Sequence, residues 1–378
     1  MNTKNYQICK RCVMDTTDPQ ISFNDEGLCN HCRDFIGTRI NHKYNGEASD
    51  AQLEAWVKEI KQAGKNSDYD VVLGLSGGID SSYAAYIARN LGLRVLAVHL
   101  DNGWNAEEAI LNIKNVCGKL KIDYESYVLD WDEFRQIQLA FLRASVPEAE
   151  TPTDMAIPAS WHRTAANYNI KYIISGGNFA TEGILPPSWH YNAKDTRYFN
   201  HIVSNFGGPK KIRDFPIFGY LQETYYKIAK GMKIVYMLNY VPYAKKEAME
   251  LLENELNWKF YGGKHYESKF TGHIQSYYLY KKFGIDYRRA TFSSQICTGE
   301  VSREEALDTL KSLPYKEENA HQEMEYLAKK LEISLEELQQ IYDLPPRYYW
   351  DYPNDEKKLR LIYNTYRRLY RREKLGSF

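Results

Sequence analysis

The chain has 378 residues, 43% of them apolar, and its 49 basic side chains balance 49 acidic ones. This length allows two or three domains with a substantial core, while the zero net charge excludes an overall basic field that would recruit nucleic acid. The sequence has no run of about 18 apolar residues, the length of a membrane span, and no apolar signal segment at its N-terminus. We therefore expect a cytoplasmic protein without a membrane partner.

Residues 1–45 are expected to form a zinc ribbon, because they contain two Cys-x-x-Cys pairs made by Cys9, Cys12, Cys29 and Cys32. Each pair can direct two thiolates the same way, and the turn signal at 25–27 brings the pairs together around one tetrahedral ion. Four thiolates fill the coordination sphere of Zn²⁺, so this metal would be structural. Redox thiols or an iron–sulfur cluster are the alternatives, and His31 is expected to be a surface residue rather than a ligand.

Residues 46–68 are expected to form a helix, and a phosphate-binding loop follows in residues 71–82. There an apolar strand ends in Ser76-Gly77-Gly78, and an amphipathic helix begins after it. The glycines let an anion approach backbone N–H groups, and the positive end of the helix dipole adds attraction. Ser76, Ser81 and Ser82 offer hydroxyls, and Asp80 offers a carboxylate that could hold Mg²⁺ against the phosphates. An ordinary Ser-Gly-Gly turn is the alternative, and the Walker A pattern is absent.

Strands and helices alternate over residues 46–240, which predicts a nucleotide-binding domain built on a doubly wound parallel sheet. Further strands are expected at 94–101, 124–129, 172–175 and 233–240, and helices at 106–120, 131–143, 154–168 and 220–231. Ligands of such sheets bind beyond the carboxyl ends of the strands. His99 and Asp101 are therefore candidate contacts for adenosine, ribose or metal, although Asp101 could equally cap the strand end. Gly176, Gly177 and Asn178 form a candidate second nucleotide-binding loop.

Residues 183–215 are irregular, polar and aromatic, which is typical of a lid or binding loop. Trp189 and Arg197 are its candidate substrate contacts. Residues 241–378 are expected to form a mainly helical region that completes the substrate site, with helices at 244–256, 302–312, 320–331, 335–342 and 355–373.

Two turns of this C-terminal region carry clustered charges. A Gly-Gly turn at 262–263 delivers Lys264, His265 and Glu267 together. A later turn presents Arg288 and Arg289, a pair that would suit a carboxylate or a pyrophosphate. A solvated surface cluster is the alternative for each of these residues.

The motif Ser-Gly-Gly-x-Asp-Ser at 76–81 resembles the PP-loop of the ATP pyrophosphatases, and nearly the whole chain resembles the N-acetyl sugar amidotransferases. The second resemblance depends on residues 9–14, 23–29, 76–82, 261–268 and 286–289. Such enzymes act in the biosynthesis of bacterial surface polysaccharides, including the O-antigen of lipopolysaccharide. The resemblance implies ATP, Mg²⁺ and a structural Zn²⁺ as cofactors and an N-acetylated, nucleotide-linked sugar as substrate.

The resemblance also implies a reaction. ATP is cleaved between its α- and β-phosphates, AMP passes to the acetamido oxygen, and ammonia attacks the resulting O-adenylyl imidate to give an acetamidino group. Asp80 would hold the metal, Lys264 would serve on the α-phosphate, and His265 or Glu267 would orient the sugar or move protons.

Ammonia is expected to come from a separate glutaminase, because position 2 is not a cysteine and Cys297 lacks the Gly-x-Cys-x-Gly setting of a triad glutaminase. The resemblance suggests a pair similar to the HisH and HisF proteins of histidine synthesis. A tRNA-thiolating PP-loop enzyme is the alternative function. Cys297 and the C-terminal arginines favour it, whereas the neutral charge and the closed spacing of the four cysteines count against it.

Overall fold

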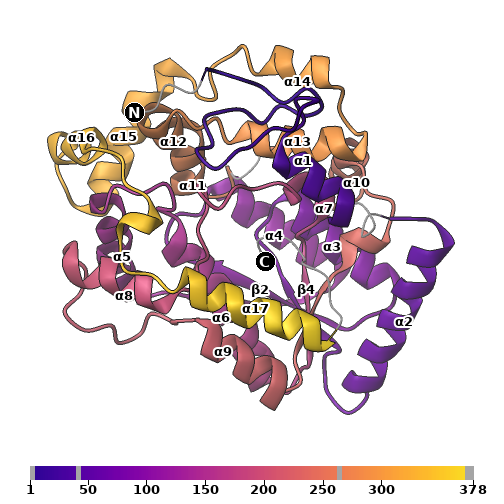
Figure 1. The fold of residues 1–378 in the computed structure, drawn as a ribbon. Helices are drawn as coiled ribbons and strands as arrows, with labels where there is room; N and C mark the ends of the chain where they lie inside the picture. The colour runs from indigo at the N-terminus through magenta and orange to yellow at the C-terminus, as the bar shows by residue number, and fades with distance from the viewer. Residues whose placement is uncertain (1–4, 40–43, 262–265, 371–378) are drawn as a thin grey trace.

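A five-stranded parallel sheet forms the centre of the computed structural model, which describes residues 5–39, 44–261 and 266–370 (Figure 1). Its strands are β1 (Val71–Gly74), β2 (Val95–Asp101), β3 (Asp123–Val128), β4 (Tyr172–Ser175) and β5 (Lys233–Tyr236), in the order β3-β2-β1-β4-β5. Val71 lies opposite Val95, and Val72 lies opposite Ile173. The order reverses between β1 and β4, and the loops after these two strands therefore flank the position where open α/β sheets bind ligands. The predicted doubly wound sheet is confirmed.

Helices cover both faces of this sheet. On one face lie α2 (Glu47–Gly64), α3 (Ile79–Asn90), α4 (Glu107–Leu120) and α10 (Lys245–Leu256), which share a buried cluster with Val71 and Leu73. Val72 and Ile173 pack on the opposite face, against α6 (Thr151–Asn167). Because successive strand residues point to opposite faces, these short apolar runs are buried on both sides, as is typical of parallel sheets.

A second, larger core joins the N-terminal ribbon to the C-terminal helices. It includes the four ribbon cysteines and side chains of α5 (Trp131–Arg143), α8 (Thr196–Asn205), α11 (Lys269–His273), α12 (Leu279–Phe283), α13 (Arg288–Thr298), α15 (Glu317–Leu331) and α16 (Leu335–Asp343). In Figure 1 the indigo ribbon, with its short helix α1 (Asn30–Asp34), lies beside α13 and α14 (Arg303–Thr309). The remaining helices are α7 (Phe179–Glu182), α9 (Tyr220–Thr224), which continues as a π-helix to Ala229, and α17 (Glu356–Tyr370). The N-terminal ribbon thus packs on helices of the C-terminal region.

Three regions differ from the sequence-based prediction. Residues 183–215 are not irregular throughout, since α8 forms within them and buries Tyr198, Phe199, Ile202 and Val203 on one face. The arginine pair does not lie in a turn, because Arg288 and Arg289 begin helix α13. The last strand also ends at Tyr236 rather than at residue 240, where a short 3-10 helix follows.

Within the described ranges, no helix combines the length and the apolar character that crossing a membrane requires.

Candidate functional site

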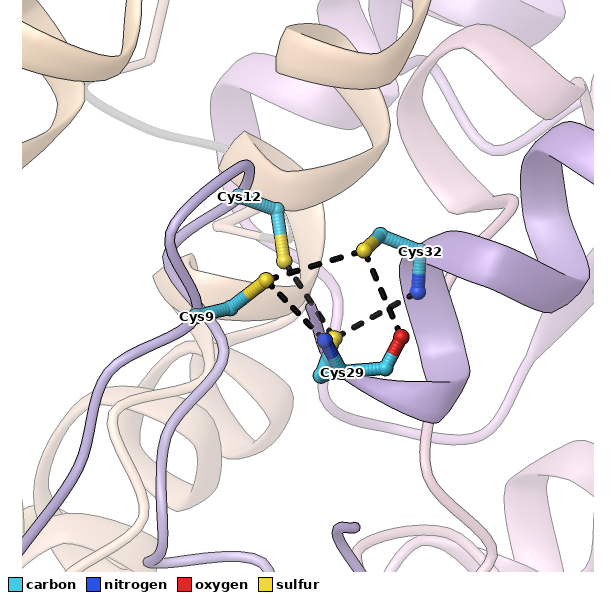
Figure 2. Close-up of side chains that lie close together, drawn as sticks. All are labelled: Cys9, Cys12, Cys29 and Cys32. Atoms are coloured by element: carbon cyan, nitrogen blue, oxygen red, sulfur yellow. Dashed lines mark hydrogen bonds between the residues drawn. The ribbon is translucent and has the colours of Figure 1, made fainter. Parts of the chain in front are cut away.

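The four cysteines of the ribbon form one compact, buried group (Figure 2). Their sulfur atoms all lie within 4.8 Å of one another, with 3.6 Å between the Sγ atoms of Cys9 and Cys32 and 3.5 Å between those of Cys12 and Cys29. A tetrahedral ion with Zn–S bonds of about 2.3 Å separates its ligands by roughly 3.8 Å. The donor set therefore fits a single zinc ion, and it is more compact than a cluster of several irons would require.

Backbone N–H groups support the charge that four thiolates would carry. The N–H groups of Arg11 and Cys29 donate to the Cys9 sulfur at 3.4 and 3.2 Å. His31 lies outside the sulfur group, as predicted for a residue that is not a ligand. Its placement on the surface was predicted wrongly: the ring is only 12% exposed and lies 2.6 Å from the Oδ2 atom of Asp18.

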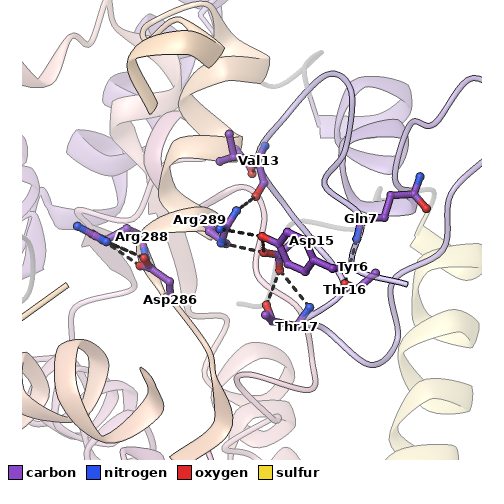
Figure 3. Close-up of polar contacts among 10 residues, drawn as sticks. Tyr6, Gln7, Val13, Asp15, Thr16, Thr17, Asp286, Arg288 and Arg289 are labelled. Atoms are coloured by element: carbon purple, nitrogen blue, oxygen red, sulfur yellow. Dashed lines mark hydrogen bonds and ion pairs between the residues drawn. The ribbon is translucent and has the colours of Figure 1, made fainter. Parts of the chain in front are cut away.

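The ribbon is held against the C-terminal region by two arginines. Arg289 on α13 donates to the Val13 carbonyl at 2.8 Å and forms an ion pair of 3.0 Å with the buried Asp15, and Figure 3 shows its side chain reaching into the ribbon. Arg303 on α14 donates to the carbonyl oxygens of Cys9 and Cys12 at 2.9 and 3.2 Å. These contacts attach the metal knuckle to two helices that are nearly 300 residues away in the sequence.

The arginine pair, predicted to contact the substrate, makes contacts with other parts of the protein. Arg289 binds the ribbon, and Arg288 forms a two-pronged contact with Asp286 and donates to the Ser312 carbonyl at 2.7 Å. Both guanidinium groups therefore serve protein contacts within this structure.

The predicted phosphate-binding loop has the geometry that an anion requires. Gly77 adopts a φ of +83°, and a Cβ atom there would lie 2.3 Å from the Ala109 carbonyl oxygen. The Gly77 carbonyl accepts the indole N–H of Trp258 at 2.9 Å, which fixes the orientation of the loop. The hydroxyls of Ser76 and Ser81 lie 3.1 Å apart, and the Gly78 N–H donates to Ser76 at 3.2 Å. Hydroxyl and N–H donors thus converge at the N-terminus of α3, where a phosphate group fits.

Two tyrosines and two carboxylates surround this loop. The position of a Cβ atom on Gly78 would lie 3.1 Å from the Tyr261 hydroxyl and 3.3 Å from Oε1 of Glu267. Tyr243 donates from its hydroxyl to Asp80. Burial raises the pKa of both tyrosines, and the charges of Glu267 and Asp80 raise it further, so both hydroxyls stay protonated. Asp80 and Glu267 supply the oxygen ligands that Mg²⁺ prefers beside phosphates.

The second glycine loop packs directly against the first. A Cβ atom on Gly176 would lie 2.7 Å from the backbone nitrogen of Ser81, so only glycine allows this approach. Asn178 caps α7 by accepting the Thr181 N–H at 3.0 Å, and the Phe179 N–H donates to Asn239 at 2.9 Å. The structure therefore brings the two predicted nucleotide loops together.

Two predicted nucleotide contacts, His99 and Asp101, lie at the end of β2. His99 lies near the phosphate-binding loop, whereas Asp101 makes local contacts. Nδ1 of His99 lies 3.1 Å from the carbonyl oxygen of Leu75, the residue before Ser76, and burial lowers the pKa of His99 so that the ring is neutral. Asp101 accepts the Gly103 N–H and the Asn105 side-chain amide, each at 2.9 Å. Asp101 thus caps the strand end, the alternative that the sequence left open.

The remaining predicted residues are distributed differently. Trp189 is only 1% exposed and packs in the larger core, and Arg197 lies 3.4 Å from Asp355 just before α17. Neither position supports the predicted substrate contact. Lys264 and His265 fall outside the described residues. Ser82 is buried near the loop, and its hydroxyl has no hydrogen-bond partner among the described residues.

Sequence reasoning missed the residues that support the loop. Tyr243 and Trp258 reach it from the segments before and after α10, and Asn112 of α4 donates to the Lys259 carbonyl at 2.8 Å. Tyr261 belongs to the motif at 261–268, but the sequence did not predict that its side chain contacts the loop. No short motif marks these side chains, because each belongs to a segment far from the loop in the sequence.

Two protein-family models match the chain. The model of the C-terminal domain of WbpG-like lipopolysaccharide biosynthesis proteins matches residues 267–370, and the NAD synthase model matches residues 51–171. The first match begins at Glu267, beside the phosphate-binding loop, and the second contains that loop. The candidate site therefore lies where the two matched regions meet.

Relatives with described functions are distant. The tRNA-specific 2-thiouridylase MnmA 2 of Fusobacterium nucleatum is 26% identical over 60% of this chain and 72% of its own length. The MnmA enzyme of Photorhabdus laumondii is 26% identical over 37% of this chain and 43% of its own length. Among solved structures, NMN synthetase from Francisella tularensis is 16% identical and covers 59% of this chain and 100% of its own, with a TM-score of 0.29. The ammonia-dependent NAD synthetase from Campylobacter jejuni is 20% identical over 55% of this chain and 84% of its own, with a TM-score of 0.28.

Proposed function

Because the chain is a WbpG-like protein of the PP-loop class, we propose that it is an ATP-dependent amidotransferase of lipopolysaccharide biosynthesis. It would convert an acetamido group of a nucleotide-linked sugar into an acetamidino group and release AMP and pyrophosphate. One observation carries this proposal. The start of the WbpG-like region places Glu267 over the Gly78 loop, so that the region that differs from NAD synthase closes the phosphate site.

The chemistry explains why a pyrophosphate-binding loop is needed. An acetamido carbon is a poor electrophile, and its oxygen becomes a leaving group only after AMP has been attached. The Ser76 hydroxyl, the Gly78 N–H and the N-terminus of α3 would bind the departing pyrophosphate and stabilise its charge. Asp80 and Glu267 would hold Mg²⁺, which neutralises charge on the phosphates when it is bound. The assignments of Lys264 to the α-phosphate and of His265 to proton transfer stay predictions.

The products test this proposal directly. The protein should form AMP and pyrophosphate from ATP and ammonium only when a suitable nucleotide-linked diacetamido sugar is present, and the sugar should lose about one mass unit as oxygen is replaced by NH. Asp80→Asn should slow pyrophosphate release by about a hundredfold, because the metal loses a ligand. Asp132→Asn is the control, since that side chain is 76% exposed on α5. Formation of ADP and phosphate in place of AMP would contradict the proposal.

The ammonia source is proposed to be a separate glutaminase similar to HisH. Glutamine alone should not support turnover, glutamine with that partner should, and high ammonium should replace both. A coupled assay of AMP formation would follow each mixture. Turnover of glutamine by the purified chain alone would remove the need for a partner.

A tRNA-thiolating function is the second candidate, and the 2-thiouridylase relatives favour it. Thiolation requires a reactive thiol near the adenylated base, and the described cysteines do not meet this condition. Four belong to the metal group, and burial raises the pKa of each of the other two, Cys117 and Cys297, to about 12. ATP cleavage to AMP that depends on tRNA instead of sugar would establish this second function.

A further inference from the structure

Most buried carboxylates in the described part of the chain are compensated by cations or by backbone N–H groups. Asp15, Asp70, Glu223 and Asp286 pair with arginine or lysine. Glu133 accepts three backbone N–H donors, and Asp195 accepts two. This pattern is expected, because burying a carboxylate without such partners is costly.

Glu148, whose Oε2 atom is buried without a hydrogen-bond partner among the described residues, departs from this pattern, and so does Glu150. The Glu150 side chain is only 9% exposed at the N-terminus of α6, and its Oε2 atom accepts the Thr271 hydroxyl. Its Oε1 atom is buried and has no hydrogen-bond partner among the described residues. The same holds for Oδ2 of Asp154, which lies one turn further along α6 and therefore on the same helix face. The side chain that faces Asp154 is His190, whose Nε2 atom is 3.6 Å from Oδ2.

The Glu150–Asp154 pair lies beside the candidate nucleotide site. Thr271 belongs to α11, whose N-cap Ser268 directly follows Glu267, the residue over the Gly78 loop. On the other side, burial raises the pKa of Tyr287, and the charges of Asp154, Glu182 and Glu150 raise it further. Glu182 closes α7, the helix capped by Asn178 of the second nucleotide loop. Both nucleotide loops thus connect to the acid pair.

We propose that Glu150 and Asp154 bind the nitrogen donor of the reaction as an ammonium ion and that Glu150 removes one of its protons. This inference rests on the proposed amidotransferase function. Two carboxylate oxygens without partners are acceptors for N–H donors, and a small cation satisfies both. Asp154 and His190 are the more exposed members of this group, with side chains that are 30% and 26% exposed, whereas Glu150 is more buried.

The step balances in protons and electrons. Ammonium gives one proton to the Glu150 carboxylate and becomes ammonia. The nitrogen lone pair forms a bond to the imidate carbon, the bond from that carbon to the AMP oxygen breaks, and AMP leaves with the electron pair. The three remaining hydrogens of ammonia are shared between the two nitrogens of the product, which forms as an amidinium cation.

Burial supports the acid–base role. Burial and then the charge of Asp154 raise the pKa of Glu150 to about 8, closer to that of ammonium than an ordinary carboxyl group would be. Sugar hydroxyls and the acetamido N–H are also donors, but they carry no charge, so only a bound cation would favour the ionised form of these buried carboxyl groups over the protonated form. The structure therefore favours a cation over a sugar at this pair.

The test separates adenylation from amination in the full-length protein. Glu150→Gln and the more exposed Asp154→Asn should keep sugar-dependent exchange of labelled pyrophosphate into ATP, which needs no ammonia. Glu150→Gln should raise the KM for ammonium at least about tenfold, with the KM values for ATP and sugar unchanged. Hydroxylamine is largely uncharged at neutral pH, so it should support amination by the Glu150→Gln variant at the wild-type rate.

Glu148→Gln is the matched control. Glu148 is also buried, burial raises its pKa to about 7, and its Oε2 atom likewise has no hydrogen-bond partner among the described residues. Its Oε1 atom accepts the Tyr198 hydroxyl at 2.6 Å within an aromatic core, away from Asp154 and His190. This variant should keep the wild-type KM for ammonium. An unchanged KM for ammonium in both site variants, or a raised KM for the sugar instead, would overturn the inference while the proposed function stands. Absence of sugar-dependent exchange in the wild type would overturn both.

Discussion

Replacing Cys29 by serine should remove the N-terminal metal and destabilise the C-terminal region as well as the ribbon. Each chain should then bind no zinc, where the wild type binds about one ion, and the thermal unfolding midpoint should fall by roughly 5 to 10 °C. Metal analysis and a melt followed by near-ultraviolet circular dichroism measure both effects. The expected shift corresponds to a loss of about 3 to 5 kcal/mol at about 2 °C per kcal/mol for a large chain.

The effect is large because the metal knuckle is an internal part of the fold. Arg303 binds the carbonyls of Cys9 and Cys12, and Arg289 binds Val13 and Asp15 (Figure 3). Without the metal these carbonyls lose their fixed positions, and the buried Arg289–Asp15 pair loses its geometry, which leaves charge poorly compensated. Helix α13 also contacts the segment that follows α7, since the Ser294 hydroxyl accepts the Ile184 N–H at 2.8 Å.

Cys297→Ser is the matched control for this variant. Cys297 lies on α13 beside the ribbon but is not one of the four cysteines whose sulfurs lie within 4.8 Å of one another. The variant should retain one zinc per chain and nearly the wild-type melting midpoint. If Cys29→Ser lost its zinc but kept the wild-type melting midpoint, the result would show that the stability of the C-terminal region does not depend on the metal.

The nucleotide half of the site could be predicted because its chemistry is local in sequence. Ser76, Gly77 and Gly78 lie between a strand and a helix, and each part has its own signal: apolar residues, glycines that allow close approach, and a helical period. The four-cysteine site could be predicted equally well, since the Cys-x-x-Cys spacing specifies the knuckles. In both cases the local pattern fixes the chemistry.

The part of the site that the C-terminal region contributes could not be predicted, because the helix face that packs there is polar and gives no hydrophobic pattern. Helix α13 buries Ala290, Ser293, Ser294 and Thr298, so its inner face has no hydrophobic period. The helix packs against the ribbon through hydrogen bonds. For example, the Val13 N–H donates to the Ser293 hydroxyl at 3.2 Å. Tertiary partners far away in the sequence determine this helix: Arg289 pairs with Asp15 of the ribbon, while Arg288 pairs with the nearby Asp286.

Replacing Gly77 by alanine should abolish most activity by displacing the phosphate-binding loop. The residue has a φ of +83°, a conformation that costs other residues about 1 to 2 kcal/mol. The new Cβ atom would also lie 2.3 Å from the Ala109 carbonyl oxygen, a backbone atom that cannot rotate away. We expect sugar-dependent pyrophosphate release to fall by at least about a hundredfold, because a displacement of about 1 Å is enough for such a loss.

Gly118→Ala shows whether this loss reflects the loop or glycine replacement in general. Gly118 lies within α4, the same helix that carries Ala109, but no atom comes within 4 Å of the added Cβ, so alanine should stabilise the helix by about 1 kcal/mol without affecting turnover. The Trp258 indole, which donates to the Gly77 carbonyl, should report the displacement in Gly77→Ala through an altered fluorescence spectrum. Wild-type pyrophosphate release by Gly77→Ala would mean that the N–H groups of this loop do not bind the departing phosphates.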